Sequence, residues 1–208
     1  MSFDPRLVDM IMRLRQRGVS DAATLRAVEQ VPRKAFVRAE DAERAYSEAA
    51  LPIDCGQVIT APLATAMLVQ LLQAGPEHKT LMIGGGSGWL AGVLSRQCKR
   101  VYVVERYVGL AKGAEARLRA QGLMNIEIRH GDGRYGWPGQ APFDRIVFGC
   151  GLRAVPEGVM AQLAKGGRLV AVVDGMLTTF DRARTKVTER EVVAMELPMI
   201  EAGKSRTL

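Results

Sequence analysis

From residue 79 onwards, short apolar segments alternate with amphipathic segments, and this alternation leaves few folds open to the chain. Strands are predicted at 79–83, 100–104, 125–129, 143–148 and 168–173, and helices at 87–97, 107–121 and 156–164. Runs such as VYVV and RLVAVV are apolar at every position, which is typical of strands buried on both faces. The sequence therefore predicts an α/β fold with a mostly parallel sheet and helices on both faces.

The segment before this core contains helical patterns and one long loop. The predicted elements are a helix at 5–17 closed by Gly18, a helix from the N-cap Ser20 to Pro32, an ordered loop at 45–62 and a helix at 62–73. Ser is a favoured N-cap residue, and Gly is favoured just after a helix ends. N-terminal helices are therefore expected to precede the sheet.

The segment after the core reads as extended chain around a charged turn at 182–186. This pattern predicts an antiparallel strand addition at one edge of the sheet. We expect a single domain over 1–208, with the helices and loop in 1–78, the core in 79–175 and the C-terminal strands in 176–208.

Composition removes several classes of function. No stretch approaches the roughly 18 apolar residues of a membrane span, and the N-terminus is too charged for a signal peptide, so we expect a cytoplasmic protein without membrane contact. The cysteines Cys55, Cys98 and Cys150 lack metal-site spacing, and His78 and His130 are the only histidines. We therefore expect no metal and no histidine-based hydrolytic triad.

The net charge of +7 raises the question of a nucleic-acid partner. Basic residues are mixed with acidic ones along most of the chain, and few aromatic residues are interleaved to stack on bases. Nucleic-acid binding is therefore the less favoured reading, and a solvated basic face is the simpler one. No pattern in the sequence indicates an oligomeric state.

The glycine-rich segment LMIGGGSGWL (81–90) follows the first predicted core strand and opens a helix. Such a turn presents backbone N–H groups at the carboxyl edge of the sheet, where ligands bind in open α/β folds. Trp89 stands where a dinucleotide fingerprint needs its third glycine, and no Gly-Lys-Ser/Thr of a P-loop follows. The loop is therefore suited to a nucleoside without a pyrophosphate.

Two further strand ends carry carboxylates that could complete a nucleoside site. Glu105 ends the second strand, 21 residues after Gly84, and is placed to reach ribose hydroxyls. In the turn HGDGR after the third strand, Asp132 could reach an adenine amino group. The alternative is that Glu105 is a surface charge and that the glycines only form a tight turn.

At this point the chain resembles the protein-L-isoaspartate O-methyltransferase family, whose members use S-adenosylmethionine to methylate damaged aspartyl residues. The resemblance is carried by VPRKAFV (31–37), AYSEAALPIDCGQVITAP (45–62), IGGGSGW, VYVVER, GDGRYGW, APFDRIV (141–147) and QLAKGGRLVAVV (162–173). It implies a Rossmann-like class I methyltransferase fold. It also implies S-adenosylhomocysteine as the product and isoaspartyl proteins or peptides as partners.

The resemblance assigns roles to particular residues of this chain. Thr60 would orient the substrate carboxylate as the catalytic residue, beside the substrate-binding Gln57, Val58 and Ile59. The cofactor would be held by Gly84, Gly85, Gly86, Ser87, Gly88, Glu105, Arg106, Asp132 and Gly133. A carboxylate is ionised at neutral pH and a sulfonium-bound methyl group is already activated, so such chemistry needs no general base.

Four departures from the family pattern leave other functions open. Val58 and Thr60 replace a Thr and a Ser, Met82 replaces an acidic residue, and Gly149–Leu152 replace small residues in an expected turn after the fourth strand. The alternative role for Thr60 is that of N-cap of the helix at Pro62. The chain could also be a catalytically impaired paralogue acting as a binding or regulatory module, or a methyltransferase for a small molecule or RNA.

Overall fold

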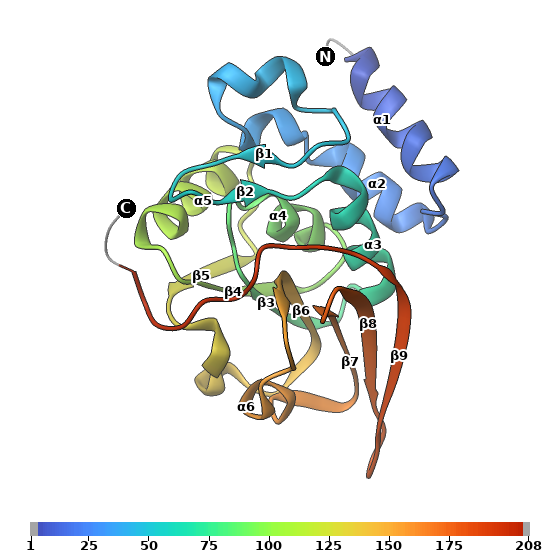
Figure 1. Ribbon diagram of the computed structural model, residues 1–208, viewed down its shortest axis with the longest axis vertical. Helices are drawn as coiled ribbons and strands as arrows, with labels where there is room; N and C mark the ends of the chain where they lie inside the picture. Colours follow the sequence, from blue (N-terminus) through green and yellow to red (C-terminus); the bar gives the residue numbers. More distant parts are fainter. Residues whose placement is uncertain (1–3, 206–208) are drawn as a thin grey trace.

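The computed structural model describes residues 4–205, so the first and last three residues of the predicted domain lie outside it. Its main sheet has the order β5-β4-β3-β6-β7-β8-β9 (Figure 1). The strands are β3 (Lys79–Ile83), β4 (Arg100–Glu105), β5 (Ile126–His130), β6 (Phe143–Leu152), β7 (Leu163–Val173), β8 (Met176–Arg182) and β9 (Val187–Ala194). Neighbours from β5 to β7 are parallel, whereas β8 and β9 are antiparallel. The α/β class and the antiparallel edge are both confirmed.

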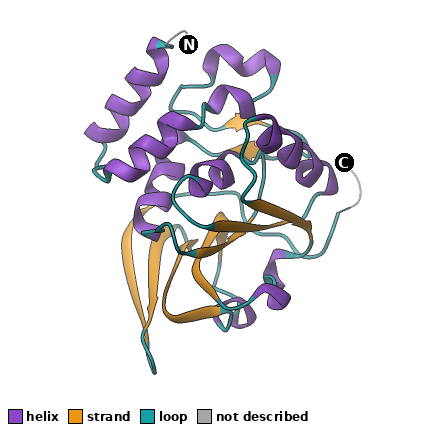
Figure 2. Ribbon diagram, turned by 180° about the vertical axis from the view of Figure 1, so that it is seen from behind, coloured by secondary structure: helices purple, strands orange, loops and turns teal. Residues whose placement is uncertain are grey.

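The longer helices lie on one face of this sheet (Figures 1 and 2). They are α1 (Pro5–Gln16), α2 (Ala22–Gln30), α3 (Pro62–Leu72), α4 (Trp89–Ser95) and α5 (Val108–Ala120). The other face carries the one-turn helix α6 (Glu157–Met160) and the 3₁₀ segments Gly133–Tyr135 and Pro138–Gln140. Helical cover on both faces is therefore present but unequal.

Side chains of the central strands alternate between two apolar cores, because successive residues of a strand point to opposite faces. Met82, Val103 and Val147 belong to the core beneath the longer helices. Leu81 and Phe148 belong to the core on the other face. All five side chains are at most 1% exposed, which explains why these strands are apolar at consecutive positions.

The N-terminal layer, which comprises residues 4–78, departs from the prediction at one helix cap. The backbone N–H of Ser20 donates to Gln70 Oε1, whereas the Asp21 carboxylate accepts the Thr24 N–H at 2.9 Å and caps α2. Ser20 as N-cap was therefore wrong by one residue, since both residue types cap well. Gly18 does end the first helical run, with a φ of 93° that favours glycine.

Two predicted elements of the second half differ in the structure. The helix predicted at 156–164 is confined to α6, because β7 begins at Leu163 and pairs there with Phe143. The turn predicted at Gly149–Leu152 is instead a continuation of β6. Gly151 donates its N–H to Pro198 O and accepts from the N–H of Ile200, both at 2.8 Å, so pairing with the C-terminal segment extends the strand.

Trp89 joins the N-terminal layer to the start of α4. Its side chain is 1% exposed, and the indole Nε1–H donates to the backbone oxygen of Val31 at 2.9 Å. This bond links the segment after α2 to the helix that the glycine-rich loop opens.

We expect Trp89→Phe to lower the free energy of unfolding by about 1–3 kcal/mol, because the buried oxygen of Val31 loses its donor. Trp137→Phe is the matched control, since a phenyl ring can keep the edge-to-face contact of Trp137 with Tyr102. Urea unfolding measures both. Equal losses in the two variants would contradict a special role for the Trp89 hydrogen bond.

Candidate active site

A hollow of about 680 Å³, part of it open to solvent, lies at the carboxyl ends of β3, β4 and β6. Its walls come from segments far apart in the chain: the loop at 57–60, the glycine-rich loop, the end of β4 and residues 198–201. Ligands of open α/β folds commonly bind at this edge of the sheet. The predicted cofactor and substrate segments therefore meet at one place.

The glycine-rich loop forms the floor of the hollow with its backbone. Gly84 and Gly86 line it, with φ values of 85° and 52° that side-chain-bearing residues rarely adopt. At Gly85, a Cβ atom would lie 2.9 Å from Val103 Cγ1. Gly88 is the N-cap residue of α4, with a φ of 93°, and the Ser87 hydroxyl accepts the Trp89 N–H at 3.2 Å. The loop thus presents main-chain groups where side chains would fill the space.

Among residues 4–205, the acidic residues that line this hollow are Glu105, the last residue of β4, and Glu201 of the C-terminal segment. The side chain of Glu105 is 4% exposed. One carboxylate oxygen accepts the N–H of Gly86 and the other accepts the N–H of Tyr107, each at 2.8 Å. The surface-charge alternative for Glu105 is therefore wrong, and each oxygen keeps a lone pair for a further donor.

Asp132 lies beside the hollow but is not among its lining residues. Its hydrogen bond with Arg134 holds the pKa of the carboxyl at about 2, and one carboxylate oxygen also accepts the N–H of Gly203 at 2.8 Å. The neighbouring Gly133 does line the hollow, and a Cβ there would collide with Ile83. Contact of Asp132 with an adenine amino group stays a prediction.

The chain after β9 crosses the carboxyl edge of the sheet, as the red segment of Figure 1 shows. We call residues 198–205 the C-terminal strap. Met199 pairs with Gly151 of β6, and Ser205 pairs with Tyr107 just after β4. The strap therefore closes one side of the hollow, which its residues Pro198 to Glu201 line.

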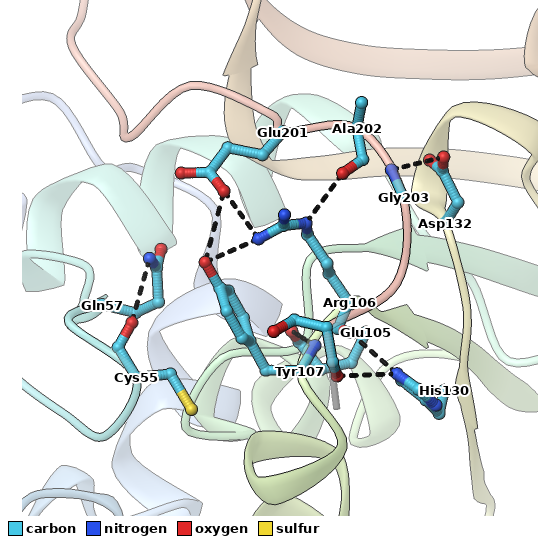
Figure 3. A network of polar contacts seen from close by, with 11 residues as sticks. Cys55, Gln57, Glu105, Arg106, Tyr107, His130, Asp132, Glu201, Ala202 and Gly203 are labelled. Atoms are coloured by element: carbon cyan, nitrogen blue, oxygen red, sulfur yellow. Dashed lines mark hydrogen bonds and ion pairs between the residues drawn. The ribbon is translucent and has the colours of Figure 1, made fainter. Parts of the chain in front are cut away.

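The side chain of Arg106 binds the C-terminal strap (Figure 3). Its guanidinium forms an ion pair with Glu201 at 2.6 Å and donates to the backbone oxygen of Ala202 at 3.1 Å. It also donates to the Tyr107 hydroxyl at 2.7 Å. No motif in the sequence pointed to Tyr107 or to the strap, because their proximity depends on the path of the chain after β9.

The loop before α3 forms the opposite wall. Gln57, Val58 and Thr60 line the main hollow, and Ile59 lines a smaller adjoining hollow with Val58 and Thr60. The Thr60 hydroxyl lies 2.7 Å from the hydroxyl of Thr65. Ala61 occupies the N-cap position of α3 and no side chain caps it, so the N-cap alternative for Thr60 was wrong.

Met82 lines the smaller hollow, and its side chain is 1% exposed. The other lining residues are also uncharged: Val58, Ile59, Thr60, Gly84, Gly85, Gly86, Ser87, Leu90 and Gly149. This end of the site therefore offers hydroxyl groups and main-chain atoms, but none of its lining residues carries a charged side chain.

Cys150 borders the main hollow from the extended part of β6. Burial raises the pKa of its thiol to about 12. The thiol is therefore protonated at neutral pH, which fits a small, half-buried apolar side chain better than a reactive nucleophile.

Comparison with known proteins agrees with this arrangement. The family model described as "Protein-L-isoaspartate(D-aspartate) O-methyltransferase (PCMT)" matches residues 6–199. A relative from Maricaulis maris named protein-L-isoaspartate O-methyltransferase is 43% identical over 209 residues, covering 99% of this chain and 98% of its own.

Solved structures show the same fold. A protein-L-isoaspartate O-methyltransferase superposes with a TM-score of 0.83 at 23% identity, covering 94% of this chain and 66% of its own. A putative one from Plasmodium falciparum, in complex with S-adenosyl-L-homocysteine, gives 0.79 at 19% identity over 93% of this chain and 97% of its own. The class I methyltransferase fold is therefore confirmed, and the chain belongs to the protein-L-isoaspartate(D-aspartate) O-methyltransferase family.

Proposed function

We propose that this chain transfers a methyl group from S-adenosylmethionine to the carboxylate of L-isoaspartyl or D-aspartyl residues in damaged proteins. S-adenosylhomocysteine is the other product. The observation that carries the proposal is the single hollow that joins the glycine-rich loop and Glu105 on one side to Thr60 on the other. Family membership supports the choice of both substrates.

The floor of the hollow fits a nucleoside that carries no pyrophosphate. Gly84 and Gly86 leave main-chain groups open to a ligand, and the buried Glu105 carboxylate offers free lone pairs. We assign cofactor binding to Glu105 and to the segment from Gly84 to Gly88, supported by Arg106, Asp132 and Gly133 at the neighbouring strand ends. The strap, held by Arg106 and Asp132, would cover the bound nucleoside.

The acceptor side requires orientation more than acid–base chemistry. When bound, S-adenosylmethionine supplies a methyl group that the positive sulfur has already activated. The Thr60 hydroxyl can donate a hydrogen bond to the acceptor carboxylate and fix its direction, while Thr65 holds that hydroxyl from behind. We assign substrate contacts to Gln57, Val58 and Ile59 as well. Proximity and alignment of this kind can supply several kcal/mol of rate enhancement.

The smaller hollow favours a second candidate, a chain that keeps the fold but binds the cofactor weakly and acts as a binding or regulatory module. Met82 supplies no charge there, and a lost charge-assisted hydrogen bond costs about 1.5–3 kcal/mol. A third candidate keeps the cofactor and methylates a small molecule or RNA. Activity on an isoaspartyl peptide separates the first function from both.

Within residues 4–205, no helix is both long and apolar enough to cross a membrane. The same residues form no disulfide. Unbridged thiols are the norm in a reducing compartment, and this supports our proposal of the cytoplasm as the place of action.

We expect the chain to transfer label from methyl-labelled S-adenosylmethionine to an isoaspartyl peptide, because Thr60 and the cofactor floor share one hollow. The same peptide with a normal aspartyl residue is the control and should stay unlabelled. Filter-bound radioactivity measures both. Absence of label from the isoaspartyl peptide, when an established enzyme of the family methylates it in parallel, would contradict the proposed acceptor.

Glu105→Gln should raise the Kd for S-adenosylmethionine about tenfold or more, because one charged acceptor becomes an amide and a hydrogen bond to charge contributes about 1.5–3 kcal/mol. Titration calorimetry measures the change. Glu127→Gln is the matched control, since Glu127 lies on neighbouring β5 and pairs with Arg100 at the surface. Equal affinities in the two variants would show that the Glu105 carboxylate does not hold the cofactor.

Thr60→Ala should lower kcat by about tenfold or more while changing the Kd for S-adenosylmethionine by less than about threefold, since one hydrogen bond of about 1.4 kcal/mol corresponds to tenfold in rate. Thr60→Ser keeps the hydroxyl and should retain most of the activity. Steady-state kinetics and calorimetry separate the two effects. Small and equal losses in kcat and affinity would mean that Thr60 has only a structural role.

A further inference from the structure

Arg33 is a fully buried arginine behind the Thr60 loop. It lies in the 3₁₀ segment Arg33–Phe36, and its side chain is 0% exposed. Its guanidinium donates to backbone carbonyl oxygens from both ends of the loop that follows: Ala45 at 2.7 Å, Ala49 at 3.1 Å, Thr60 at 2.9 Å and Ile59 at 3.4 Å. A planar guanidinium can hold several acceptors in fixed directions, which an ammonium cannot do. Arg33 therefore joins the two ends of this loop.

No carboxylate within residues 4–205 forms an ion pair with Arg33. Burial alone lowers the pKa of the guanidinium, to about 10, so it stays charged at neutral pH. A buried charge without a counter-ion is costly and is usually paired. Carbonyl dipoles stabilise this cation, but its net positive charge remains directly behind the wall that Thr60 forms.

Arg33 also contacts the residue that opens α4. Its Cζ atom lies 5.3 Å from the centre of the Trp89 ring, in the range of a cation–π interaction. Trp89 follows the glycine-rich loop and is held by Val31, two residues before Arg33. One buried side chain thus contacts both the loop that carries Thr60 and α4, the helix that follows the glycine-rich loop.

We propose that Arg33 is a positioning residue for methyl transfer: it fixes the backbone at Thr60 and makes the acceptor side of the hollow favourable to an anionic group. The proposal rests on the proposed function, because the acceptor of that reaction is a carboxylate. The positive charge attracts the acceptor carboxylate electrostatically across the wall of the hollow, without direct contact. It favours the charged acceptor over a neutral one of the same shape.

The test compares the binding of two peptides to the full chain in the presence of S-adenosylhomocysteine. One peptide carries isoaspartate, and the other carries the neutral amide, isoasparagine, at the same place. The Kd of the isoasparagine peptide divided by the Kd of the isoaspartyl peptide measures the preference for the carboxylate. We expect Arg33→Met to lower this ratio about tenfold relative to the wild type. Arg38→Met is the matched control, because Arg38 donates to Ile53 O in the same loop but lies half-exposed beside Glu40.

Arg33→Lys separates charge from positioning and guards against a methionine variant that does not fold. It should keep the carboxylate preference within about threefold of the wild type but lower kcat tenfold or more, because an ammonium cannot hold all the carbonyl groups. Circular dichroism and S-adenosylhomocysteine binding confirm that each variant is folded. A wild-type ratio in folded Arg33→Met, or an unchanged kcat in Arg33→Lys, would overturn the proposal.

The wild type distinguishes this failure from failure of the proposed function. If the wild-type chain neither methylates the isoaspartyl peptide nor prefers it to the amide, the proposed function fails and the role of Arg33 fails with it. If the wild type does both and the folded Arg33 variants match it, only the role of Arg33 is overturned.

Discussion

The carboxylate of Glu105 is the point on which the proposed site depends. It accepts the N–H of Gly86 from the glycine-rich loop and the N–H of Tyr107 from the start of the next helix. Because β3 and β4 are parallel neighbours, both segments leave the sheet at the same edge. The adjacent Arg106 then fastens the C-terminal strap through Glu201 (Figure 3). Loss of this carboxylate would disturb the floor and one wall of the hollow together.

The unequal cover of the sheet explains why the site has a separate acceptor wall. The longer helices and the loop before α3 lie on one face, where Trp89 and Arg33 tie them to the cofactor-side loop. Thr60 therefore meets the glycine-rich loop through packing of the N-terminal layer and not through the sheet itself. In this account the sheet provides the nucleoside site, and the N-terminal layer adds the acceptor side.

The parts of this arrangement that were predictable are those set by local pattern. Apolar runs located the core strands, and the spacing from Gly84 to Glu105 placed both at one edge. Long-range contacts were not predictable: the extension of β6 through Gly151 depends on pairing with Met199, and the strap depends on the path after β9. Arg33 illustrates the same limit. Its burial depends on carbonyl groups of Ala45 and Thr60, which only the folded path of the loop brings to it.

The most direct test of the central claim is calorimetric titration of the full chain with S-adenosylmethionine. If the glycine-rich loop and Glu105 form the cofactor site, despite the uncharged Met82 beside it, the titration should saturate at one site per chain with micromolar affinity. Absence of binding heat at millimolar cofactor, over a range of temperatures, would contradict the account and favour a chain that has kept the fold as a binding module.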